Sequence, residues 1–216
     1  IGPDGQLTGF EIDLARELCE RLAATCSIQP VRWDGLFDAL QRGQGDAIIA
    51  ALRISPENRR KARFTTAYFR SPARFVARRA TPLADAAVAT LRQQRVAVVA
   101  RSAHEAYLTA FFPQTTRVAV ETAAAALDAV ARDEVAAAFI DATVAAFWLN
   151  GESSGNCCRF VSGSFIESRF FGEGSGIAVR RDGEPLRRGL DWALQAMAAD
   201  GAYARLYLKY FPVGLY

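Results

Sequence analysis

The sequence is short of histidine and methionine, with one residue of each among 216. The single imidazole, His104, has no second histidine for a metal site, and the four cysteines lack the paired CxxC spacing typical of zinc ligands. No serine or cysteine can be paired with His104 by spacing. The sequence therefore predicts no metal, no cofactor and no catalytic residue.

An excess of one charge sign and long apolar runs are also missing. The 26 basic and 23 acidic residues give a net charge of +3, whereas nucleic-acid-binding proteins concentrate basic charge on one face. No apolar run approaches the roughly 20 residues that span a bilayer. What is present is a 51% hydrophobic composition, enough for one large domain or two small ones with separate cores.

The four cysteines form two close pairs in the sequence. Cys19 and Cys26 lie between a predicted helix end and a predicted strand start, and Cys157 and Cys158 are adjacent. Buried thiols and a short-loop disulfide both fit the first pair, and a disulfide would place the protein outside the cytosol. We predict no pairing for the second pair, because neighbouring cysteines seldom bridge without strain.

Strand and helix patterns alternate along most of the chain, which is typical of α/β proteins with parallel sheets. A Thr8 to Glu11 capping box opens the first predicted helix, and two helices close the chain at 184–200 and 203–210. Residues 150–176 are rich in glycine and serine and are predicted to be irregular. The predicted strands are 28–33, 46–52, 95–100, 117–120, 135–140 and 176–181.

Ligands of parallel sheets bind beyond the carboxyl ends of the strands, and this rule selects the candidate site residues. Arg53 follows one predicted strand, Ser102 and His104 open the helix after another, and Asp141 follows a third. Trp33 ends a further predicted strand. A plain helix cap at Asp141, a core position for Trp33 and a surface position for His104 remain as alternatives.

A basic stretch, AALRISPENRRKARF at 50–64, holds five basic residues and one acid. Ser55-Pro56-Glu57 within it predicts a helix start. We expect the basic residues after Glu57 to lie mostly on a solvated helix face.

Three segments resemble the periplasmic substrate-binding proteins of polar amino-acid ABC transporters, known as bacterial solute-binding protein family 3. These are DGQLTGFEIDLARELCERL, WDGLFDALQRGQGDAIIAALRISPENRRKARFTTAYF and FFGEGSGIAVRRDGEPLRRGLDWALQAMAADGAYARLYLKYFPVGLY. The resemblance implies a type II clamshell, in which two α/β lobes with mostly parallel sheets are joined by a two-stranded hinge. Lobe one would be 1–70 with 175–216, and lobe two 71–174. The family's first strand has no counterpart in the sequence that starts at Ile1.

The resemblance also assigns ligand-binding positions in lobe one. In the family, an aromatic residue at the position of Trp33 stacks on the ligand, and Ser or Thr residues at the positions of Ala51 and Arg53 bind it. The arginine that pairs with the α-carboxylate falls at Asn58, which cannot form a charge-assisted bidentate pair. We therefore expect Arg53 to bind the ligand's anionic group, with Arg59 as the alternative.

In lobe two, family ligand contacts fall at Ala103 and His104, and the aspartate that holds the α-amino group falls at Asp141. Some family members carry a disulfide at the spacing of Cys19 and Cys26, so we predict that bridge.

The function implied is non-covalent capture of a small amino-acid-like or related carboxylate solute, which is passed to an ABC permease. The resemblance further implies a monomer in the periplasm or another extracytoplasmic space, secreted through an N-terminal signal that this chain does not contain. One alternative is the ligand-sensing domain of a signalling receptor. The other is an enzyme similar to prephenate or arogenate dehydratases, for which Glu173 is the nearest candidate for the required carboxylic acid.

Overall fold

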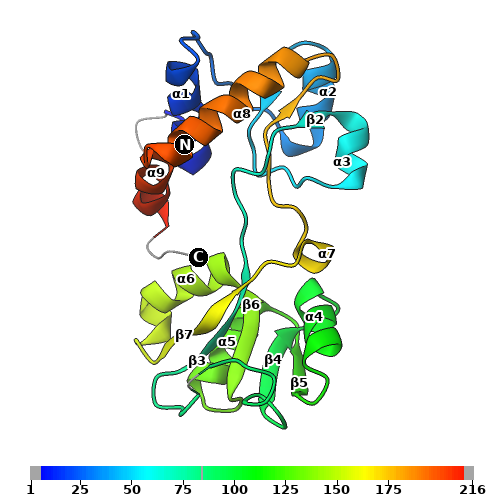
Figure 1. Cartoon of the computed structure of the whole chain (residues 1–216). Coiled ribbons are helices and arrows are strands. Elements are labelled where there is room, and N and C mark those ends of the chain that lie inside the picture. The colour runs from blue at the N-terminus through cyan, green and yellow to red at the C-terminus, as the bar shows by residue number, and fades with distance from the viewer. Residues whose placement is uncertain (1–5, 84, 212–216) are drawn as a thin grey trace. The chain divides into compact units, whose positions relative to one another are not determined.

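The computed structural model describes residues 6–83 and 85–211, which form two units (Figure 1). The first unit combines the described chain up to Arg70 with Gly172–Tyr210, and the second is Ser71–Phe171, with which Phe211 also groups. The chain therefore passes between the units after Arg70, after Phe171 and again after Tyr210. Each unit has its own sheet and core.

The first unit contains a small antiparallel sheet flanked by helices (Figure 1). Its strand order is β1-β8-β2, so the strand latest in sequence lies between the two earlier ones. The elements are α1 (Phe10–Arg21), a 3-10 helix (Trp33–Gly35), α2 (Leu36–Gln41), β1 (Ala47–Ile48), α3 (Pro56–Lys61), β2 (Arg63–Phe64), β8 (Ala178–Val179), α8 (Glu184–Ala199) and α9 (Ala202–Tyr210).

The core of the first unit follows the helical spacing of apolar residues in its sequence. Leu14 and Leu18, one turn apart on α1, are buried together with Leu190 and Met197 of α8. A second cluster between β1, β2 and α2 includes Leu40.

The second unit is built on a five-stranded mixed sheet with the order β5-β4-β6-β3-β7. β4 pairs in parallel with β5 and β6, whereas β3 pairs antiparallel with β6 and β7. The elements are β3 (Ala73–Arg78), β4 (Arg95–Val99), α4 (Ala103–Phe111), β5 (Thr116–Val120), α5 (Ala123–Ala131), β6 (Ala137–Asp141), α6 (Ala142–Asn150), a second 3-10 helix (Glu152–Ser154), β7 (Cys158–Phe165) and α7 (Ser168–Phe171).

The helix starts at Ser55 and Ser102 agree with the sequence prediction. The Ser55 and Ser102 hydroxyls each accept a backbone N–H bond at 3.2 Å and thus cap α3 and α4. The Thr122 hydroxyl caps α5 in the same way at 3.1 Å. The predicted capping box at Thr8 is wrong, because α1 begins after Gly9 without a side-chain cap. Glu11 instead accepts hydrogen bonds from the Ala51 N–H and the Tyr68 hydroxyl.

Three strand predictions need correction. Residues 28–33 form no strand, the 46–52 segment pairs only at β1, and that pairing is antiparallel. The segment 150–176, predicted to be irregular, contains the eight-residue strand β7. The α/β class holds, but the sheets are antiparallel in the first unit and mixed in the second, so "mostly parallel" was wrong for the first.

Both cysteine pairs are disulfides. The predicted Cys19–Cys26 bridge is confirmed, with Cα atoms 6.2 Å apart. Cys157 and Cys158 are also bonded to each other, which we did not predict.

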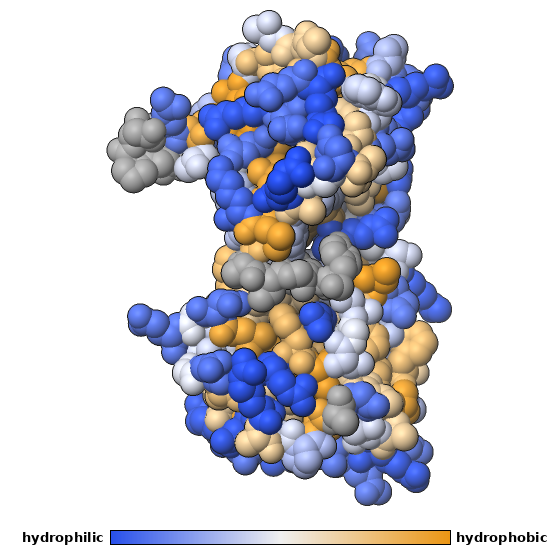
Figure 2. All heavy atoms as spheres, turned by 60° about the vertical axis from the view of Figure 1, so that its left-hand side comes forward, coloured by the Kyte–Doolittle hydropathy of each residue, from blue (hydrophilic) through white to orange (hydrophobic). Residues whose placement is uncertain are grey.

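Figure 2 shows hydrophilic and hydrophobic residues interspersed over the surface of both units, with no uniformly hydrophobic area on the face drawn. The exposed large apolar side chains include Trp33, Trp192 and Leu208. Within 6–83 and 85–211 no helix combines the length and the apolar character needed to cross a membrane.

Candidate functional site

In the first unit, the chain turns sharply at the end of the segment that carries β1. Ala51 has a left-handed backbone with φ of 48°, which costs a non-glycine residue roughly 1 kcal/mol. Its N–H donates to Glu11 and to the Tyr68 hydroxyl, the latter at 3.1 Å, and the Ser175 hydroxyl donates to its carbonyl at 3.1 Å. These contacts fix the backbone immediately before Arg53.

Tyr68 is buried beneath this turn and bonded to Glu11. Burial, reinforced by the nearby Glu11 carboxylate, raises the pKa of Tyr68. The phenol therefore stays neutral and acts as a fixed donor to Glu11.

Arg53 is exposed and its backbone is held at two points. Arg53 forms an isolated antiparallel β-bridge with Ser175. Its carbonyl accepts a 2.9 Å hydrogen bond from the Asn58 side-chain amide. A Cβ atom added to Gly172 would lie 3.8 Å from a terminal guanidinium nitrogen of Arg53. The Arg53 guanidinium therefore lies against Gly172. The Asn58 side chain thus helps to hold the Arg53 backbone in place.

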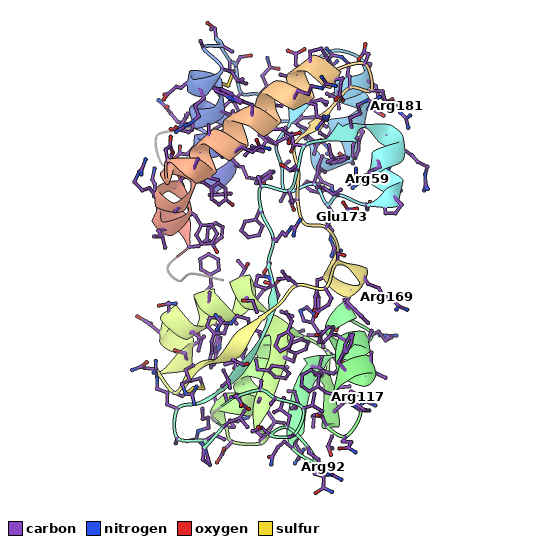
Figure 3. All side chains as sticks on the ribbon, in the orientation of Figure 1. Arg59, Arg92, Arg117, Arg169, Glu173 and Arg181 are labelled. Atoms are coloured by element: carbon purple, nitrogen blue, oxygen red, sulfur yellow. A yellow bond between two sulfur atoms is a disulfide. The ribbon has the colours of Figure 1, made fainter. Side chains whose placement is uncertain are left out.

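Arg59 forms an ion pair with Glu173, with a nitrogen–oxygen distance of 2.6 Å (Figure 3). Both side chains are about half exposed, at 48% and 49%. The pair ties α3 to the segment that begins at Gly172, so the alternative cation for an anionic ligand already has a carboxylate partner.

Trp33 lies on the first 3-10 helix and is 66% exposed. The alternative that it is a core residue is therefore wrong. Among the described residues no ring contact or hydrogen bond ties its side chain to the group around Arg53, and its role as a ligand platform stays a prediction.

In the second unit, Asp141 caps α6. One carboxylate oxygen accepts the N–H groups of Thr143 at 2.9 Å and Val144 at 3.1 Å. The Ser71 and Thr143 hydroxyls lie 2.7 Å apart beside it. Within the described chain the other Asp141 oxygen accepts no hydrogen bond, so the cap leaves half of the carboxylate available.

His104 is half-buried near the start of α4. The centroid of its ring lies 5.6 Å from that of Phe139 and 5.2 Å from that of Phe171. The alternative of a fully exposed surface histidine is therefore wrong, because the ring is partly buried. Burial lowers the pKa of His104, and the negative charge of Asp141 opposes that shift. His104 and Asp141 therefore share one electrostatic environment.

Ser102 and Ala103 form the start of α4 beside His104. The Ser102 hydroxyl donates to the Val99 carbonyl at 2.6 Å and accepts from the Glu105 N–H at 3.2 Å. Glu105 reciprocates by accepting from the Arg101 N–H at 2.6 Å. Ser102 is thus fully used as a cap, and Ala103 offers only backbone groups.

The structure brings the predicted residues into two groups, one in each unit. The first holds Ala51, Arg53, Asn58 and Arg59; the second holds Ser102, Ala103, His104 and Asp141. The prediction missed Glu11, Tyr68 and Ser175, whose contacts join segments far apart in sequence. Among the described residues no group of three or more histidines, cysteines or acids could hold a metal ion.

A family model described as bacterial extracellular solute-binding proteins, family 3, matches residues 1–213. The L-arginine-binding protein of Pseudomonas aeruginosa is 33% identical over 99% of this chain and 83% of that protein. The lysine/arginine/ornithine-binding periplasmic protein of Escherichia coli is 27% identical over 98% of this chain and 82% of its own length.

Solved structures share the fold. An ancestral cationic amino acid solute-binding protein has 27% identity and a TM-score of 0.68, covering 97% of this chain and 88% of that one. The unliganded L-cystine solute receptor of Neisseria gonorrhoeae has 21% identity and a TM-score of 0.82, covering 97% and 86%. The expected type II periplasmic-binding-protein fold is confirmed.

Proposed function

The chain belongs to the bacterial extracellular solute-binding proteins of family 3, and we propose that it captures a small amino acid outside the cytoplasm for import by an ABC transporter. The observation that carries this proposal is similarity over almost the whole chain to the arginine-binding protein of Pseudomonas aeruginosa. A membrane permease is then the macromolecular partner, and the periplasm or its equivalent is the location.

The ligand class we propose is an α-amino acid with a cationic side chain. Several relatives are named for arginine, lysine, ornithine or histidine. Two carboxylates that take part in no ion pair among the described residues lie near the candidate positions, Glu11 in the first unit and Asp141 in the second. Negative groups of this kind favour a ligand with positive charge.

In the first unit we assign the ligand's carboxylate to Arg53. Its backbone is fixed by Asn58 and Ser175, and its planar guanidinium can bind a carboxylate through two hydrogen bonds. Arg59 is the weaker candidate because it would have to leave Glu173. Trp33, which is exposed, is assigned to stacking on the ligand.

In the second unit we assign the ligand's ammonium group to Asp141. The helix cap uses one carboxylate oxygen, which orients the group and leaves the other oxygen as an acceptor. Charge-assisted hydrogen bonds of this kind are about twice as strong as neutral ones.

A dehydratase function has less support. It would need a carboxylic acid at Glu173 that is available to a substrate, whereas Glu173 is held in a 2.6 Å ion pair with Arg59. The relatives are named as binding proteins, and we assign no catalytic step. No observation favours the receptor alternative.

The test is a thermal-shift and calorimetric screen of arginine, lysine, ornithine and histidine against glutamate, glutamine and cystine. A ligand at 100 times its dissociation constant should stabilise the fold by about 2.7 kcal/mol. Binding of a cationic amino acid supports the proposal. Exclusive binding of acidic or neutral solutes would refute the cationic class, and absence of binding to any amino acid would refute the function.

A further inference from the structure

The first unit contains a pocket of about 490 Å³ that is separate from most of the candidate ligand residues. Four arginines from four places in the chain line it, together with one carboxylate: Arg59 of α3, Arg63 of β2, Arg181 after β8, and Arg187 with Glu184 on α8. Figure 3 labels Arg59 and Arg181, which project from neighbouring parts of this unit. The sequence had placed most of the basic stretch on a solvated helix face, whereas two of its residues line this pocket.

Backbone carbonyls hold two of these guanidinium groups in place. Arg63 Nε donates to the Arg181 carbonyl at 2.6 Å, and Arg181 Nε donates to the Arg60 carbonyl at 3.1 Å. A carbonyl positions a guanidinium without cancelling its charge, and each guanidinium has five N–H donors. The side chains are thus oriented but still carry charge for a further partner.

The carboxylates nearby are too few for the arginines. Glu184 is shared by Arg187 at 2.7 Å, Arg188 at 3.1 Å and Arg63 at 3.5 Å. Hydrogen bonds from Arg187 and Arg188 lower the pKa of Glu184 to about 2, as expected in a surplus of positive charge. Within the described residues Arg181 has no acidic partner.

Two further acids pair with the other two arginines that line the pocket. Glu173 pairs with Arg59, and Asp191 pairs with Arg187. The positive charge that lacks a close carboxylate is therefore centred on Arg63 and Arg181. Arg63 lies on β2, and Arg181 lies in the turn after β8, the strand that pairs with β2.

We propose that this pocket binds a small multivalent oxyanion of the phosphate class. Planar guanidinium forks match phosphate oxygens in bidentate geometry, and the volume exceeds what one such anion needs. The anion can be a free solute or the headgroup of an anionic phospholipid, which share this chemistry. The site is independent of the amino-acid site proposed above, with which it has only Arg59 in common.

The test uses inorganic phosphate and pyrophosphate in calorimetry at constant ionic strength, and cosedimentation with phosphatidylglycerol vesicles. Arg181→Gln should weaken binding about tenfold or more, because it removes a charged donor. Binding in solution identifies a free anion as the ligand. Arg181-dependent binding to vesicles alone identifies the lipid headgroup.

Two matched controls lie outside the pocket. Arg180→Gln changes the neighbouring residue, which pairs with Asp46 at 3.0 Å and does not line the pocket. Arg117→Gln removes an exposed charge from the second unit (Figure 3). Both should bind phosphate and vesicles like the unchanged protein. If Arg181→Gln does not fold by circular dichroism, Arg63→Gln is measured in its place.

Three results would overturn the proposal. They are an absence of binding to all three probes, an equal loss in Arg180→Gln and Arg181→Gln, and one-for-one displacement of the anion by arginine. The last result would place the anion in the amino-acid site. Because the probes are not amino acids, failure here leaves the proposed import function standing.

Discussion

Single substitutions can decide whether Arg53 or Arg59 binds the carboxylate of the amino-acid ligand. Arg53→Ala should weaken amino-acid binding by about 1.5–3 kcal/mol, the usual value of a charged hydrogen bond. Arg59→Ala should have a smaller effect, because Arg59 is already paired with Glu173. Calorimetric dissociation constants decide the matter, with Arg60→Ala as the control. A larger loss in Arg59→Ala would show that the wrong arginine was chosen.

Asp141 is both a helix cap and the proposed acceptor for the ligand's ammonium group. Asp141→Asn keeps an oxygen for the N–H groups of Thr143 and Val144 but removes the charge. We expect a loss of about 1.5–3 kcal/mol in ligand binding and a much smaller change in unfolding free energy. A variant that binds the amino acid normally would reduce Asp141 to a cap.

His104 gives the fold a defined pH dependence. Burial lowers its pKa in the folded state below the unfolded value of about 6.5, so the unfolded chain binds the proton more readily. The stability associated with neutral His104 is present above that pH and is lost as the pH falls below it. Urea unfolding at pH 7.5 and pH 5.5 should show a smaller pH-dependent loss in His104→Gln than in the unchanged protein. Identical losses would contradict this assignment.

At the scale of elements, the two disulfides should differ in their effect on stability. Cys19–Cys26 closes a loop between residues seven apart, worth about 2–3 kcal/mol in the chain-entropy picture. Cys157–Cys158 joins neighbours and restricts the unfolded chain little, so its contribution should be about 1 kcal/mol or less.

The measurement is urea denaturation of the double variants Cys19→Ala/Cys26→Ala and Cys157→Ala/Cys158→Ala. Because Cys158 is buried, alanine avoids placing a hydroxyl in the core. A greater loss for the adjacent pair would mean that its bridge stabilises the folded state directly.

Helix starts were predictable because caps depend on residues three positions apart, as at Ser55 and Ser102. Strands were less so, because their lengths depend on distant partners. β1 is two residues long since only Ala47 and Ile48 pair with β8. No prediction covered β3, although all but two of its six residues are buried. β7 was not predicted, because it lies in a segment rich in glycine and serine.

The position of Asp141, at the end of a strand and the start of a helix, was predictable from the local sequence. Contacts that join distant segments were not predictable. Glu11 and Tyr68 are 57 positions apart, and nothing in the local sequence of either indicates the partner. The ion pair of Arg59 with Glu173 spans 114 positions, so the competition for Arg59 could not be foreseen from the basic stretch alone.

For the whole molecule, the division into two units predicts that the second can fold by itself. Ser71–Phe171 is continuous in sequence and holds a five-stranded sheet with its own buried clusters. The excised fragment should show cooperative thermal unfolding by circular dichroism and dispersed amide signals by NMR. The matched fragment 1–70 should show neither, because it lacks β8, α8 and α9. An unfolded 71–171 fragment would mean that its sheet depends on the rest of the chain.

The position of β8 in the first sheet also bears on how the protein is made. Val179 lies opposite both Ala47 and Arg63, so the central strand is synthesised long after its two neighbours. Until the ribosome has passed that point, β1 and β2 have no partner and their backbone edges are open. A polypeptide that stops before Ala178 therefore keeps an unfinished sheet, and its exposed edges make it a substrate for proteases.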